Sequence, residues 1–354
     1  MGGNALKKVV AARMDQSTYS TIETIILSVL KQYYSECSSV INRPEKEKDG
    51  HGDMDILYLG NNINILDVII KEFNPIEYHK NGTIYSIAYK HLDAYHQIDL
   101  ILCTSIEQYN ASKFYFSYGD LGGILGRMTS YGGIKFGSDG LWLYYFPTGN
   151  PCENAIYIHL TYDPQIICKY LNLDYDVYLK GFTKLVDVFD WLIASNYFYT
   201  NIFDFDTNIF DFDTLNHDHK RRTIKRPMYQ QFVEGLPPLG GEHSTLNGED
   251  IKKLNKPLDV PHNDYIKKMQ NDALNYFEKN DYLKEQLDEI KCKQEFKEKF
   301  SGKLFVDLGV NVKLINESIV KFKNHIMEIY KMPFENYIIS TSKEDIINQI
   351  KLTI

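Results

Sequence analysis

Apolar residues recur at helical spacing in two segments near the start of the chain. Residues 18–36 (TYSTIETIILSVLKQYYSE) place isoleucine, valine and leucine every three or four positions, and Ser17 or Thr18 is available as a helix cap. Residues 64–73 (NILDVIIKEF) repeat the same spacing over a shorter length. Both segments are therefore predicted to be amphipathic helices.

A second pattern, with apolar residues at alternate positions or in short runs, falls between and after these helices. It is present in 38–42, 53–60, 82–90 and 95–103, which are predicted to be strands. Two further runs flank the sequence GSDG at 137–140, which predicts a hairpin. Strands interleaved with helices predict an α+β domain with a mixed sheet flanked by helices.

The character of the chain changes at about residue 166. Segment 168–198 is helical in pattern with Gly181 interrupting it, and 263–350 is mostly helical and rich in lysine. We therefore expect an N-terminal domain over 1–165 and a mainly helical domain over 166–354. A flexible insertion is expected around 200–262, where Pro and Gly are frequent.

The insertion contains a tandem duplication, NIFDFDTNIFDFDT, at residues 201–214. Two copies of seven residues with alternating aspartates do not form a coiled-coil heptad pattern. We interpret the repeat as a surface loop, because loops tolerate insertions, with a metal site built from its aspartates as the alternative.

Composition narrows the class of protein. The chain has 354 residues, 44% of them hydrophobic and 24% charged, so it is expected to bury a sizeable core. No apolar run approaches the ~20 residues of a membrane span, and the first residues lack the pattern of a secretory signal. Five scattered cysteines without a CxxC pair indicate reduced thiols. We therefore expect an intracellular protein that is neither secreted nor membrane-bound.

Three aspartates carry the chemistry. Asp53 and Asp55 lie at alternate positions of one predicted strand, so their carboxylates project from the same face. Asp99 lies among isoleucine and leucine in another strand, where a charge is costly unless it is compensated. If the two strands are neighbours, three carboxylates converge. Mg²⁺ or Mn²⁺ is the natural ligand of such a cluster, and a pair of these ions supports nucleotidyl transfer.

The motif GDMD followed by hydrophobic residues, together with the later strand aspartate, resembles the DNA polymerase β-like nucleotidyltransferase superfamily. The resemblance covers about 40–105, and within that superfamily the chain is most similar to poly(A) polymerase-like, RNA-tailing enzymes of giant-virus type. It implies that Asp53, Asp55 and Asp99 are both catalytic and metal-binding. A nucleoside triphosphate, with ATP expected, would be the substrate.

The chain departs from the superfamily where the triphosphate is usually held. The resemblance implies a Gly-Gly or Gly-Ser turn about ten residues before the aspartate pair, and 38–46 contains none. We consider Gly2, Gly3 and Asn4 in the sequence GGNAL as a replacement, because glycines at a helix N-terminus let phosphate approach backbone N–H groups. A frayed terminus is the alternative.

Two lysines are further candidates for binding phosphate. Lys48 shortly precedes the aspartate pair, and Lys135 lies between glycines in the predicted hairpin. Solvated surface lysines are the alternative in both cases. Asp120 is expected to be a helix cap, with a nucleotide or metal role as its alternative.

The acceptor is expected to be RNA. Residues 299–326 are similar to the helical tail of poly(A) polymerases and CCA-adding enzymes. Residues 251–354 hold 18 Lys and Arg against 16 Asp and Glu, whereas the whole chain has a net charge of −8, so the C-terminal part is the part that a polyanion can approach. Tyr131, Phe136 and Tyr144 are candidates for stacking on bases. The resemblance implies an mRNA-processing role in the cytoplasm, a viral factory or a virion.

Three alternatives to RNA tailing stay open. The fold could serve as a non-catalytic scaffold or regulatory subunit, or the nucleotide could pass to a protein or to a small molecule. The basic stretch with His217, His219, Arg221 and Arg222 is either an RNA contact or a surface loop. A homo-oligomer is also left open.

Overall fold

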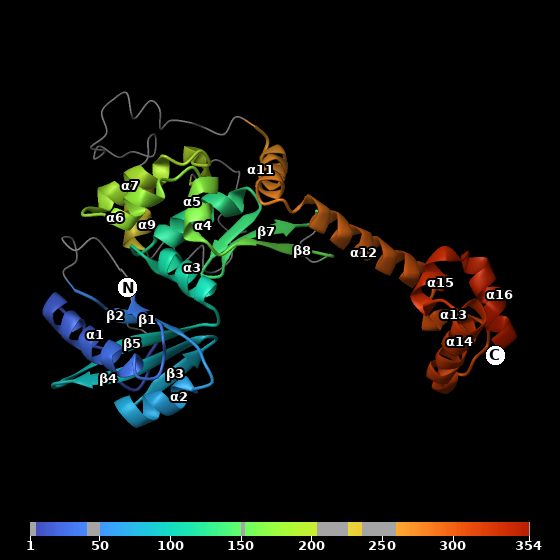
Figure 1. The fold of residues 1–354 in the computed structure, drawn as a ribbon, viewed down its shortest axis with the longest axis horizontal. Coiled ribbons are helices and arrows are strands. Elements are labelled where there is room, and N and C mark those ends of the chain that lie inside the picture. The colour runs from blue at the N-terminus through green and yellow to red at the C-terminus, as the bar shows by residue number, and fades with distance from the viewer. Residues whose placement is uncertain (1–4, 41–49, 150–152, 204–225, 236–259, 354) are drawn as a thin grey trace. The chain divides into compact units, whose positions relative to one another are not determined.

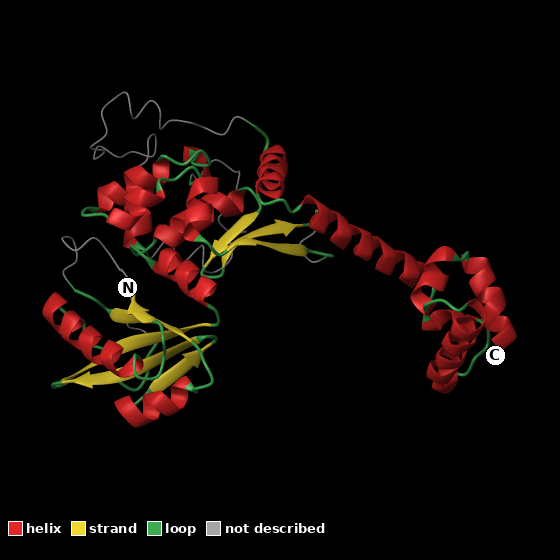
Figure 2. Ribbon diagram, in the orientation of Figure 1, coloured by secondary structure: helices red, strands yellow, loops and turns green. Residues whose placement is uncertain are grey.

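The computed structural model describes residues 5–40, 50–149, 153–203, 226–235 and 260–353. The chain forms two compact units, one of residues 1–145 with 157–277 and the other of 146–156 with 278–354. The architecture is α+β, as predicted: a mixed five-stranded sheet with flanking helices, followed by a mainly helical C-terminal region (Figures 1 and 2).

The five-stranded sheet has the order β1-β2-β5-β4-β3. Neighbouring β2 and β5 are parallel, whereas the other pairs are antiparallel. The strands are β1 (Cys37–Ser39), β2 (Asp53–Leu59), β3 (Tyr78–Asn81), β4 (Ile84–His91) and β5 (Ala94–Cys103). The runs at 53–60, 82–90 and 95–103 thus form strands as predicted, while β3 was not anticipated.

Two helical segments cover one face of this sheet. Helix α1 (Gln16–Leu30) begins at least two residues earlier than the predicted caps allow, because Asp15 caps it by accepting the N–H of Thr18 at 2.7 Å. The second segment is α2 (Ile65–Val68), which continues as a π-helical turn, η1 (Ile69–Phe73). Their apolar sides pack on the even-numbered positions of β2 and β5, and the core they form includes Ile22, Ile26, Met54, Ile56, Ile98 and Leu100.

The rest of the first unit is built around a second sheet of order β6-β7-β8. The hairpin of β6 and β7 turns between Gly137 and Gly140, as predicted. The strands of this sheet are β6 (Ile134–Gly137), β7 (Gly140–Tyr145) and β8 (Ile156–Thr161). The helices are α3 (Ile106–Phe116), α4 (Leu121–Tyr131), α5 (Pro164–Tyr170), α6 (Tyr175–Lys180), α7 (Leu185–Ile193), η2 (Thr200–Ile202), α9 (Pro227–Glu234) and α11 (His262–Tyr276).

The first unit extends well past residue 165, where the sequence placed a domain boundary. Contacts between residues far apart in sequence join the later part of this unit to elements before residue 146. Gln270 of α11 donates to the Tyr144 carbonyl of β7 at 2.9 Å, and Arg127 of α4 donates to the Ile202 carbonyl at 2.9 Å. These buried contacts explain why 157–277 groups with the N-terminal part of the chain.

The second unit is helical and has its own core. Its elements are α12 (Asn280–Lys299), α13 (Gly302–Asp307), η4 (Val312–Leu314), α14 (Ile315–Tyr330), α15 (Phe334–Ser340) and α16 (Lys343–Thr353). Phenylalanine dominates the core, where the rings of Phe300, Phe322 and Phe334 pack on one another within 6 Å between centroids. No helix in the described part of the chain is both long and apolar enough to cross a membrane.

Candidate metal centre

The register of the two parallel strands brings the three aspartates together. Asp55 of β2 lies opposite Asp99 of β5, and Asp53 lies opposite Gln97. Because these positions are two apart on each strand, all four side chains project from the same face of the sheet. One oxygen from each aspartate lies within 4.8 Å of the others, close enough to share an ion. The expected convergence of the three carboxylates is therefore present.

This face of the sheet is divided into an apolar half and a polar half. At its apolar end Leu57, Ile101 and Cys103 are buried together beneath Tyr109 of α3. The Tyr109 hydroxyl donates to the Ser38 hydroxyl at 2.7 Å, which ties α3 to the edge strand. The same face carries the aspartates at the opposite end of β2 and β5, beyond this apolar cluster.

Asp99 lies in a largely buried environment that perturbs its titration. Burial, with a smaller contribution from the neighbouring charge of Asp53, raises the pKa of Asp99 from 3.8 to about 6. Hydrogen bonds from Ser86 and Gln97 act in the opposite direction because they favour the ionised form. The Gln97 amide donates to both carboxylate oxygens, at 3.0 and 3.1 Å. Asp99 is thus a partly desolvated carboxylate whose ionised form is held by two neutral donors.

The donor set fits a hard divalent cation. Three carboxylates supply oxygen ligands, which Mg²⁺ and Mn²⁺ prefer over nitrogen or sulfur. All three are presented from the backbone of paired strands, so their spacing is set by the sheet rather than by a loop. Asp53, Asp55 and Asp99 are the residues that would hold the ion, and its positive charge would offset the repulsion among them.

Of the residues proposed to bind phosphate, Lys135 lies within the described part of the chain. Gly2, Gly3, Asn4 and Lys48 lie outside the described residues. The neighbouring Ala5 is described, and its N–H donates to the side-chain oxygen of Gln97 at 2.9 Å. The expected helix N-terminus after the glycines is not present in the described residues, because 5–14 is irregular and α1 begins at Gln16.

Lys135 lies on β6, in the second sheet. Its ammonium group is 3.4 Å from the carboxylate of Asp139 and 5.9 Å from the centre of the Tyr144 ring. The nearby negative charge of Asp139 contributes to raising the pKa of Lys135. These contacts stabilise the turn of the hairpin, and the Lys135 side chain is 43% exposed.

The remaining candidates are also placed by their burial. Tyr131 and Phe136 are buried in the core, with 1% and 4% of their surfaces exposed, and offer no stacking surface for a base, while Tyr144 is partly exposed. Asp120 does lie at the cap position of α4, but its side chain makes no cap hydrogen bond and instead pairs with Arg226 at 3.5 Å. The basic stretch at 217–222 lies outside the described residues.

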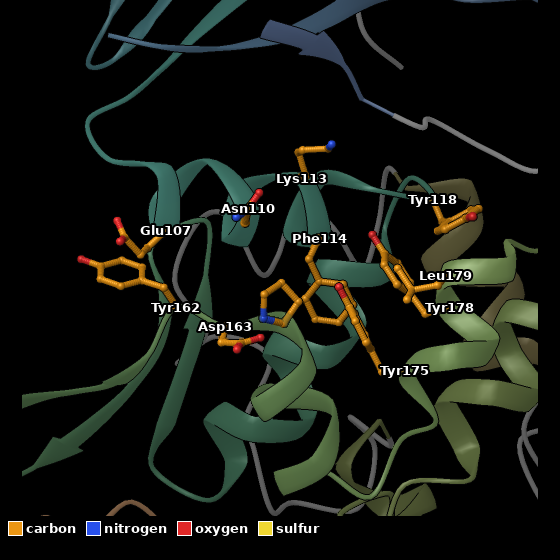
Figure 3. Close-up of a pocket in the computed structure, with 11 residues that line it drawn as sticks. Glu107, Asn110, Lys113, Phe114, Tyr118, Tyr162, Asp163, Tyr175, Tyr178 and Leu179 are labelled. Atoms are coloured by element: carbon orange, nitrogen blue, oxygen red, sulfur yellow. The ribbon is translucent and has the colours of Figure 1, made fainter. Parts of the chain in front are cut away.

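A cavity of about 540 Å³ in the first unit was not anticipated from the sequence (Figure 3). It lies among α3, α5 and α6, and its walls are rich in aromatic rings. The Tyr178 ring packs edge-on against Phe114, with centroids 4.8 Å apart, and stacks with Tyr175 at 5.7 Å. Asn110 and Lys113 supply polar groups from the exposed side of α3. Its residues come from segments 107–118 and 162–179, whose proximity no local pattern reveals.

Comparison with known proteins adds no family to these observations. The chain matches no protein-family model, and no curated protein is similar to it at a significant level.

Proposed function

We propose that this chain is a metal-dependent nucleotidyltransferase that adds nucleotides to the 3′-hydroxyl of an RNA acceptor, in the manner of a poly(A) polymerase. The observation that carries the proposal is the convergence of Asp53, Asp55 and Asp99 on one face of parallel strands. This arrangement accords with the sequence resemblance, in which a strand aspartate pair and a later strand aspartate form one site.

Each aspartate has a role in the proposed reaction. Asp53 and Asp55 hold Mg²⁺ or Mn²⁺ together with Asp99, and the bound ions would supply positive charge to the entering and leaving oxygens. Asp99 orients the attacking 3′-hydroxyl and favours loss of its proton. The 3′-oxygen would form a bond to the α-phosphorus of the nucleotide while the bond to the leaving pyrophosphate breaks.

The aromatic cavity gives the proposal a place for unpaired bases. Single-stranded nucleic acid is often held by aromatic rings, with basic groups on its phosphates. Tyr175 and Tyr162 present partly exposed rings to the cavity, and Lys113 is exposed on its rim. We assign this cavity to acceptor or nucleotide bases, with ATP as the expected nucleotide.

The direct test is incubation of the protein with radiolabelled NTPs, Mg²⁺ and a single-stranded RNA primer. We expect the wild-type protein to lengthen the primer and Asp55→Asn to lose at least a hundredfold in rate, since it removes a metal ligand. Asp93→Asn is the matched control, because Asp93 is an exposed carboxylate in the turn between β4 and β5. It should leave the rate unchanged.

Other outcomes distinguish the alternatives. Label that appears on protein rather than on RNA would indicate a protein acceptor, and a labelled small product would indicate a small-molecule acceptor. No transfer to any acceptor, with metal bound, would favour the scaffold or regulatory role. Full activity of Asp55→Asn would overturn the assignment of the metal ligands.

A further inference from the structure

The side chain of Gln97 connects Asp99 to the N-terminal segment. Its amide nitrogen donates to both oxygens of Asp99, at 3.0 and 3.1 Å, and its amide oxygen accepts the N–H of Ala5 at 2.9 Å. Only 2% of Gln97 is exposed, so these bonds compete little with water. The connection needs an acceptor and a donor at one side-chain tip, which an uncharged amide of this length provides.

The N-terminal segment is itself anchored beside the sheet. We call residues 5–14 the strap. The N–H groups of residues 7–9 donate to the carboxylate of Glu77, at 2.8, 2.7 and 3.3 Å. Farther along the strap, the N–H of Ala12 donates to the Tyr95 carbonyl at 2.8 Å. The strap that carries the Ala5 N–H is thus attached both to β5 and to the segment just before β3.

Building on the proposed function, we infer that Gln97 is a positioning residue for Asp99 and that the strap holds Gln97 in place. Asp99 faces other carboxylates, which repel it from the point where an ion would be shared. The paired donation from Gln97 restrains rotation of the Asp99 carboxylate and offsets that repulsion. Without it, Ser86 is the remaining side-chain donor to Asp99 among the described residues that act on its pKa.

The first test is a titration with Mn²⁺ alone, followed by electron paramagnetic resonance of the free ion. Outer donors to metal ligands are typically worth about 10- to 100-fold in affinity. We expect Gln97→Met, which keeps the length but loses all three of these side-chain hydrogen bonds, to weaken Mn²⁺ binding by about tenfold or more. Gln270→Met is the matched control, because Gln270 is also a buried amide donor, to the Tyr144 carbonyl in the same unit. Equal Mn²⁺ affinity in both variants and the wild type would overturn the inference.

The second test acts from the strap. Ala5→Pro removes the N–H that Gln97 accepts, whereas Lys8→Pro removes an N–H from the same strap that goes to Glu77. We expect Ala5→Pro to weaken Mn²⁺ binding several-fold and Lys8→Pro to change it little. If Gln97→Met weakens binding and Ala5→Pro does not, the role of the strap is overturned. Ala5→Pro also probes the link should Gln97→Met fold poorly.

Kinetics separate positioning from general damage to the fold. At saturating Mn²⁺, Gln97→Met should lower kcat with little change in KM for NTP, because the nucleotide contacts are unchanged. A loss explained entirely by a smaller folded fraction would contradict positioning. A wild-type protein that binds Mn²⁺ but transfers no nucleotide would overturn the proposed function, while the Mn²⁺ titrations would still decide the role of Gln97.

Discussion

Replacement of Asp99 by asparagine offers the sharpest test of the electrostatics of the candidate metal centre. The change keeps the size of the side chain and removes its charge. In the ion-free protein it should therefore stabilise the fold at neutral pH, although it removes a residue essential to the proposed reaction. Loss of function combined with a gain of stability is the signature of a charge held at a site for a ligand.

The magnitude follows from the pKa of Asp99, which folding raises from 3.8 to about 6. A shift of about two units corresponds to about 3 kcal/mol against the ionised form in the folded state. The folded protein binds the proton more tightly than the unfolded chain, so this cost is absent below pH 4, grows as pH rises, and is complete above pH 6. Asparagine keeps one acceptor for Gln97 and loses another, which costs about 1 kcal/mol. We expect a net gain of about 2 kcal/mol at pH 8.

The assay is urea unfolding in EDTA at pH 4, 5, 6, 7 and 8, followed by tryptophan fluorescence. The chain has two tryptophans, Trp142 and Trp191, and both lie in the first compact unit, so the signal reports on the unit that carries Asp99. The stability difference between Asp99→Asn and the wild type should be near zero or slightly unfavourable at pH 4 and should increase to pH 7. Added Mn²⁺ should stabilise the wild type by mass action and the variant much less.

Two results would refute this reasoning. A stability difference that does not vary between pH 4 and pH 8 would mean that Asp99 titrates alike in the folded and unfolded chains. A variant that is less stable than the wild type at pH 8 in EDTA would mean that the fold stabilises the ionised form of Asp99. Asp93→Asn, at an exposed turn, serves as the control and should show no dependence of this kind.

Two further predictions concern the scaffold around the site. Gly140 has φ of +86°, and an added Cβ would lie 2.3 Å from the Thr161 carbonyl oxygen. Gly140→Ala should therefore destabilise the first unit by about 1–3 kcal/mol. Gly82→Ala, at φ +58° but in open space, is the control and should cost less in the same urea assay. Tyr109→Phe removes the hydrogen bond from the Tyr109 hydroxyl to Ser38 and should lower the free energy of unfolding by about 1 kcal/mol without altering Mn²⁺ affinity. A change in that affinity would contradict the separation between the apolar and polar halves of the sheet face.

The parts of the fold that the sequence predicts best are those with runs of apolar residues. β2 and β5 are mostly buried, and Asp53, Asp55 and Asp99 stand out as partly exposed positions within them. β3 (Tyr78–Asn81) was missed because all four residues are exposed at the edge of the sheet, which leaves no alternation to detect. β8 (Ile156–Thr161) was also not predicted, although the sequence carries a signal for it: the apolar residues Ile156, Ile158 and Leu160 alternate along the strand and are buried.

The candidate site was predictable only where it is local in sequence. Asp53 and Asp55 share a face by spacing alone, and Gln97 could have been added by the same rule, because it lies two residues before Asp99. The strand pairing that places Ser86 beside Asp99 is a tertiary fact that no local pattern contains. The bond from Ala5 to Gln97 spans 92 positions and had no signal in the sequence.

The balance of charge at the site favours an ion-binding role over a purely structural one. Burial and the carboxylate of Asp53 raise the pKa of Asp99, and two neutral donors, Ser86 and Gln97, lower it. Neutral donors hold the Asp99 carboxylate in place without cancelling its charge, so with the described residues alone a net cost of about 3 kcal/mol remains in the ion-free protein. A cation from the protein would offset that cost but would also compete with a metal. An arrangement that positions the Asp99 carboxylate and leaves its charge available is therefore suited to a divalent ion, and a scaffold that binds none would gain nothing from it.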